Sequence, residues 1–106
     1  MIYKVKARFK KETAGDFRRK LTDGTIASQK PDGKELVAAM QRAVVGSSGD
    51  VEWSERCYCD PPLAHERETV LDHHFDDITT EAIDDYQQAE GRAFMDYLDQ
   101  LAGESA

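Results

Sequence analysis

The chain has 106 residues, of which 33% are charged and 40% hydrophobic, and its net charge at neutral pH is −7. A chain of this length is expected to fold as one domain, residues 1–106, with a core that needs neither disulfides nor a structural metal. No apolar run approaches the roughly 20 residues that cross a bilayer, and the first ten residues alternate charge, so we expect a cytoplasmic protein without membrane or signal segments.

Charge is divided unevenly along the chain. Residues 1–49 hold 11 Lys or Arg and 5 Asp or Glu, whereas residues 50–106 hold three arginines and 16 acids. We expect the two halves to face each other through ion pairs; the alternative is that the acidic half occupies a basic protein partner. Nucleic-acid binding is disfavoured, because a polyanion requires an accessible basic stripe.

The first half of the chain contains the clearest local patterns. Ile2–Lys10 alternates apolar and basic side chains, which is typical of a half-buried strand. Thr13 is a suitable N-cap for a helix that ends at Gly24. Residues 25–28 are predicted as a short strand or an extended connection, and residues 31–33 as a turn.

A second helix is expected after this turn. Asp32 and Glu35 fit the N-cap and N3 positions of a capping box, and the helix is expected to run to Val45. Residues 51–59 then alternate as a second strand, in which Glu55 interrupts the apolar face.

The last part of the chain follows a Pro-Pro turn. Glu68–Ile78 resumes an alternating, extended pattern. A cap at Thr79 or Thr80 and an apolar stripe that reaches Leu101 predict a long final helix. Gly91 inside this stripe predicts a close packing contact or a bend, because glycine destabilises a helix interior.

This order of elements, strand-helix-(strand)-helix-strand-strand-helix, predicts an α+β fold. We expect a two-layer sandwich with a mainly antiparallel sheet of three or four strands and helices on one face. In element order alone it resembles ferredoxin-like two-layer sandwiches. The other face of such a sheet needs cover, so a homodimer through the sheet face or the final helix is expected.

The densest group of potential ligands and acid/base residues is the Asp72–Asp77 segment. On a strand, Asp72, His74 and Asp76 share one face, where two carboxylates and an imidazole suit a divalent metal or a general base. The alternative is a solvated face balanced by basic side chains of the first strand. His73, on the other side, is expected to be a hydrogen-bonded core histidine.

A second group of candidate ligands can be assembled across a turn. Cys57, Cys59, His65 and His73 supply the residue types of a Cys2His2 zinc site, although their spacing differs from that of known fingers and ribbons. The alternative is that both cysteines are reduced and extend the apolar strand face. We favour no metal and no cofactor, with zinc as the alternative.

The sequence has no phosphate loop and no nucleophile elbow. We therefore expect a small non-enzymatic interaction or regulatory module that self-associates. One alternative is a metal-dependent or acid/base enzyme centred on Asp72–Asp77, or on Cys57, Cys59 and His65. The other is an acidic protein that occupies a basic partner.

Overall fold

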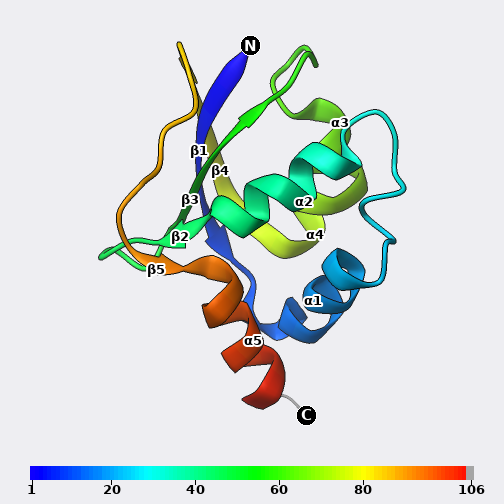
Figure 1. The fold of residues 1–106 in the computed structure, drawn as a ribbon, viewed down its shortest axis with the longest axis vertical. Coiled ribbons are helices and arrows are strands. Elements are labelled where there is room, and N and C mark those ends of the chain that lie inside the picture. The colour runs from blue at the N-terminus through cyan, green and yellow to red at the C-terminus, as the bar shows by residue number, and fades with distance from the viewer. Residues whose placement is uncertain (105–106) are drawn as a thin grey trace.

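Five strands form an open antiparallel sheet in the order β4-β1-β3-β2-β5 in the computed structural model, which describes residues 1–104 (Figure 1). The strands are β1 Ile2–Phe9, β2 Val44–Val45, β3 Val51–Arg56, β4 Phe75–Ile83 and β5 Arg92–Ala93. The predicted α+β class and antiparallel sheet are confirmed. The expected number of three or four strands is wrong, because β2 and β5 extend the sheet and are too short to show alternation.

Helices cover one face of this sheet (Figure 1). They are α1 Ala14–Thr22, α2 Gly33–Arg42, α3 Ala64–Glu66, α4 Asp72–His74 and α5 Phe94–Glu104, with a 3-10 turn at Lys11–Thr13 and a π turn at Arg67–Leu71. The α1 and α2 helices are confirmed, but α2 ends at Arg42 and not at Val45, because Val44 and Val45 pair with β3 as a strand. Residues 25–28 form turns. Within residues 1–104, no helix has the length and apolar character needed to span a membrane.

The first strand has the predicted alternation. Its inward side chains, Val5, Ala7 and Phe9, are buried, and its basic side chains lie on the open face. Arg8 forms an ion pair with Asp77 of β4 at 3.0 Å, and Lys6 lies 3.7 Å from Asp50. The expected pairing of the basic strand with acidic neighbours is therefore confirmed at these positions.

A β-bulge interrupts the pairing of β1 with β4. Lys6 pairs with Thr79, but Arg8 pairs with Asp76, so two residues of β4 oppose one of β1. Asp77 lies at this bulge with φ 54°, a left-handed conformation in which an Asp side chain is tolerated.

The segment expected to be extended from Glu68 is helical. The α3 helix, the π turn and α4 are continuous, so residues 64–74 form one helix that packs against the sheet. The strand starts only at Phe75. Asp72 and His74 therefore do not share a strand face with Asp76, and the prediction that placed them there is wrong.

The final helix is shorter than predicted. Residues 79–83 belong to β4, where they pair with the first half of β1, and residues 84–91 connect β4 to β5 without regular structure. Gly91 has φ 152°, and a Cβ atom there would meet the carbonyl oxygen of Val45. The close contact expected at Gly91 is present, but in a connection rather than in a helix.

Four phenylalanines hold the helices on the sheet. Phe9 of β1, Phe17 of α1, Phe75 of β4 and Phe94 of α5 contact one another, with all six ring-centroid distances between 5.3 and 6.2 Å. All four side chains are buried. Their mutual packing holds α1 and α5 against β1 and β4.

The β2 strand pairs with only the first residues of β3. The rest of that edge of β3 forms hydrogen bonds with side chains of α2 and with the connection 84–91. Glu35 accepts a hydrogen bond from the backbone N–H of Arg56 at 2.8 Å, and Arg42 donates one to the carbonyl oxygen of Ser54 at 2.9 Å. The Ser54 hydroxyl bonds both main-chain groups of Gln87, at 3.0 and 3.1 Å. These contacts place the N-terminus of α2 beside the end of β3.

Candidate functional site

His74 is a buried component of the core and not an exposed base. Its Nδ1 lies 2.8 Å from the Thr13 hydroxyl, its Nε2 lies 3.3 Å from Lys20 Nζ, and its ring stacks on Phe17 at 4.4 Å. Burial and the Lys20 ammonium lower the pKa of His74 to about 4. Neutral His74 therefore accepts a hydrogen bond from Lys20 and donates one to Thr13.

The other members of the Asp72–Asp77 segment point elsewhere. Asp72 is exposed and pairs with Arg67 at 3.1 Å, while Asp76 lies 3.7 Å from Lys10. His73, predicted as the core histidine of the pair, is exposed and His74 is buried instead. The reversal follows from the helix, because His74 lies three and four residues after the buried Leu71 and Val70 and so shares their face, whereas a strand would have placed His73 with Leu71.

The proposed zinc ligands are not brought together. His65 turns toward Asp32, His73 lies at the far end of the same helix, and Cys57 and Cys59 lie after β3. Among residues 1–104, no group of three or more His, Cys, Asp or Glu side chains has the geometry of a metal site.

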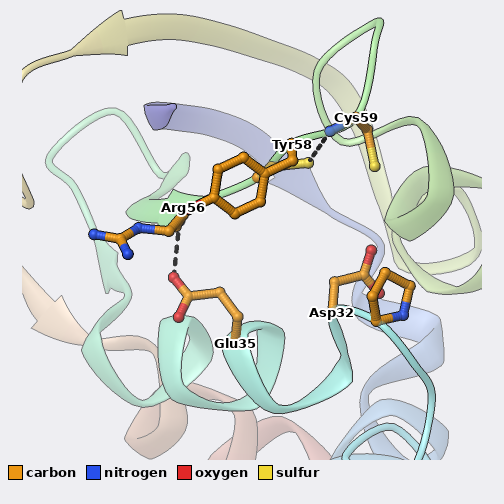
Figure 2. A pocket seen from close by; sticks show the side chains of 7 residues that line it. Asp32, Glu35, Arg56, Tyr58 and Cys59 are labelled. Atoms are coloured by element: carbon orange, nitrogen blue, oxygen red, sulfur yellow. Dashed lines mark hydrogen bonds between the residues drawn. The ribbon is translucent and has the colours of Figure 1, made fainter.

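A pocket of about 300 Å³ lies between the N-terminus of α2 and the chain that follows β3. We call it the thiol pocket; it is lined by Pro31, Asp32, Glu35, Arg56, Cys57, Tyr58 and Cys59. Figure 2 shows Asp32 and Glu35 projecting from α2 on one side, opposite Tyr58 and Cys59 on the other. The pocket thus combines two carboxylates and two thiols from segments far apart in the sequence.

Asp32 and His65 are hydrogen-bonded to each other beside this pocket. His65 Nδ1 lies 3.0 Å from both carboxylate oxygens of Asp32. The Asp32 side chain is 11% exposed and that of His65 is 37% exposed. Asp32 stands at the N-cap position predicted for it but makes no side-chain capping bond, since its carboxylate is directed to His65.

The two cysteines are reduced and differ in exposure. Cys57 is buried and Cys59 is half-buried. Burial raises the pKa of the Cys57 thiol, and so does the neighbouring Cys59 thiol. Cys57 therefore extends the apolar inner face as expected, but the strand ends at Arg56, so the two cysteines do not lie on a common strand face.

Glu55 and Glu66 form a buried carboxyl pair behind the pocket. Both side chains are within 1% of complete burial, and Trp53 Nε1 donates a hydrogen bond to Glu55 Oε1 at 2.7 Å. Burial and the Glu55 carboxyl raise the pKa of Glu66 to about 12, and burial also raises that of Glu55. No donor from the described residues reaches the other three oxygens, so a proton held by Glu66 is needed to bridge the pair.

A second functional surface lies at the adjoining end of the sheet. Met1, Tyr58 and Tyr86 are the large apolar residues that are exposed within residues 1–104, at 61%, 82% and 39%. The Cys57 N–H donates to the Met1 carbonyl, and the Tyr86 hydroxyl donates to Glu35, so these residues surround the end of β3. We call this surface the apolar end.

Next to Tyr58 the apolar end is hollowed. The end hollow has a volume of about 510 Å³ and is lined by Met1, Ile2, Arg56, Tyr58, Ala82, Ile83 and Asp84. Arg56 and Tyr58 line both this hollow and the thiol pocket, so they form the ridge between the two.

No protein-family model, curated protein or solved structure matches the chain. The thiol pocket and the apolar end are the two candidate sites that the structure offers among residues 1–104. Sequence reasoning identified Cys57, Cys59 and His65, but it missed the roles of Asp32, Glu35 and Glu66. The one local signal was Glu55, a carboxylate on an otherwise apolar strand face.

Proposed function

We propose that the protein is a small non-enzymatic interaction module of the cytoplasm that forms a homodimer through its apolar end. The observation that carries this proposal is the grouping of Met1, Tyr58 and Tyr86 around one end of the sheet. Exposed apolar groups gathered in one place are typical of interaction surfaces, and Tyr, Met and Arg are enriched there.

The shape and charge of this end favour a second copy as the occupant. Tyr58 projects beside a hollow whose walls include Ile2 and Ile83, so two copies related by a two-fold axis can exchange these side chains. Arg56 is exposed and has no ion pair within residues 1–104, and Asp84 lies across the same hollow. The exchange would bring Arg56 of each copy to Asp84 of the other.

The strand order supports a ferredoxin-like assignment within this proposal. Helices connect β1 to β2 and β3 to β4, and the four strands neighbour one another as β4-β1-β3-β2. This is the arrangement of two split β-α-β units. The β5 strand and the α5 helix are then additions at the edge beside β2.

Sedimentation equilibrium at micromolar concentration tests the homodimer. We expect twice the chain mass of 11.9 kDa for the wild-type protein. Tyr58→Ser and Arg56→Glu should give monomers, whereas Lys11→Glu, a charge reversal at the opposite end of β1, should remain a dimer. A wild-type monomer, or dimers that survive both changes, would reject the proposal.

Mixing two charge-reversed variants tests the geometry of the interface. Arg56→Glu and Asp84→Arg should each be monomeric alone. In a mixed dimer, Glu at position 56 faces Arg at position 84 and the second contact keeps its wild-type residues, so mixing should restore the dimer. A mixture that stays monomeric would show that these two positions do not meet.

The Asp32–His65 pair supports an acid/base enzyme as a second candidate function. A carboxylate that holds Nδ1 of a histidine orients its Nε2 for proton transfer, and the pair borders a pocket. An activity found by substrate screening should then fall at least about 100-fold in His65→Gln and retain its value in His73→Gln.

A third candidate function is that of an acidic protein that binds a basic partner, and it rests on the acidic residues of the segment 50–106.

A further inference from the structure

The thiol pocket brings together two cysteines that are two positions apart in the chain, at a site open to solvent. Cys57 Sγ accepts a hydrogen bond from the N–H of Cys59 at 3.2 Å, and both side chains line the same pocket. Figure 2 shows the Cys59 side chain on the wall of the pocket, above the Asp32 carboxylate. Cys59 is half-buried, so an ion that reaches the pocket can reach its sulfur.

The loop after β3 passes the Cys57 sulfur, which accepts the hydrogen bond from the Cys59 N–H. Leu63 is buried and has φ 63°, a conformation that is rare for a residue of its kind. The Cys59 N–H directed at the Cys57 sulfur is a donor that a metal-bound sulfur can keep.

We propose that Cys57 and Cys59 bind one thiophilic monovalent ion, Cu⁺ under reducing conditions, through two thiolates. Soft thiolate ligands select Cu⁺ over harder ions. Within residues 1–104 no third ligand joins them, as the absence of any larger group of metal-binding side chains shows. Zn²⁺ requires about four ligands, whereas an ion of the Cu⁺ type is satisfied by two opposed sulfurs.

Binding involves no redox change. Each S–H bond breaks, its proton passes to solvent, and the ion forms one bond to each sulfur, so the bound centre carries one negative charge. The N–H group of Cys59 offsets part of this charge at Cys57. The Asp32 carboxylate on the facing wall is hydrogen-bonded to His65.

Titration with Ag⁺, a redox-inert ion of the same charge, tests the site. We expect ultraviolet sulfur-to-silver absorbance to saturate at one ion per chain, and one equivalent to protect both cysteines from a thiol reagent. Cys57→Ser and Cys59→Ser should each weaken binding about 100-fold or more, because each removes the chelating partner. His65→Gln and excess Zn²⁺ should change the titration little, and Cu⁺ should bind with the same stoichiometry under anaerobic conditions.

The proposal is overturned if the wild-type protein takes up two Ag⁺ ions independently, or if either single-cysteine variant binds as tightly as the wild type. Removal of Ag⁺ by an equal concentration of glutathione would also overturn it, since two fixed thiols must outcompete single ones. If the Cys57→Ser variant does not fold, Cys59→Ser and the protection experiment still decide the question. The homodimer is tested separately through Asp84, which lines the end hollow but not the thiol pocket.

Discussion

Replacing Glu66 by Gln should stabilise the protein at neutral and alkaline pH. The folded protein buries the Glu66 carboxyl beside that of Glu55, with a pKa raised from 4.5 to about 12 by burial and by the neighbouring carboxyl. The unfolded chain ionises the same group near its ordinary pKa. A raised pKa adds stability that is complete below pH 4.5 and is lost as pH rises toward 12.

The size of the effect follows from proton linkage. At pH 7, keeping a proton on a carboxyl of pKa 4.5 costs about 3 kcal/mol, at about 1.4 kcal/mol per pH unit. The free energy of unfolding should therefore fall by about 2 kcal/mol between about pH 7 and pH 8.5. The amide of Glu66→Gln can donate a hydrogen bond to Glu55 without taking up a proton, so this slope should disappear.

Urea unfolding of wild type, Glu66→Gln and Glu68→Gln over this pH range measures the slopes. Glu68 lies on the same helix but is exposed, so its variant should follow the wild type. This pH range lies above that in which His74 titrates and below that in which the Cys57 thiol titrates, so neither group adds its own pH dependence to the free energy of unfolding. Parallel curves for wild type and Glu66→Gln would refute a protonated buried Glu66.

Three further outcomes are expected. Gly91→Ala should lower the free energy of unfolding by about 1–3 kcal/mol, because its φ is unfavourable and its Cβ would meet the Val45 carbonyl; an unchanged melting temperature would contradict this contact. In the Glu66→Gln background, stability should fall by about 3 kcal/mol from pH 6.5 to pH 4, since unfolded His74 takes up a proton that the folded protein excludes, and His74→Leu should remove this fall. A thiol reagent should label native Cys59 well before Cys57, and equal rates would mean that Cys57 is not buried.

Parts of the fold are predictable because their pattern is local. The alternation of Ile2–Lys10 predicts which side of β1 is buried. The helical spacing of Ala14, Phe17 and Leu21 likewise predicts the inner face of α1. In both elements one face is apolar throughout. Periodicity then gives the element and its orientation together.

The helix over residues 64–74 was missed because its inner face is partly polar. The buried positions include Glu66 and His74 alongside Val70 and Leu71, so the apolar period is broken at two of them. The π turn adds one residue to the repeat and shifts it further. What remained was a short alternating stretch that fits a strand equally well.

The end of the chain was misassigned for a tertiary reason. Residues 79–83 and the following connection carry apolar residues at helical spacing, but β1 offers an open edge on which 79–83 pair as a strand. Long-range pairing therefore overrides the local pattern. Asp32 and His65 are likewise 33 positions apart, and only the tertiary fold brings the start of α2 into contact with α3.

The bulge at Asp77 affects how the molecule behaves in a crowded solution. The outer edge of β4 is the longest strand edge left without a neighbour in residues 1–104, and such an edge is a template on which other chains can assemble. The left-handed residue breaks its run of backbone donors and acceptors, and Asp76 and Glu81 place charge along it. Open-ended growth of fibrils from this edge is thereby discouraged.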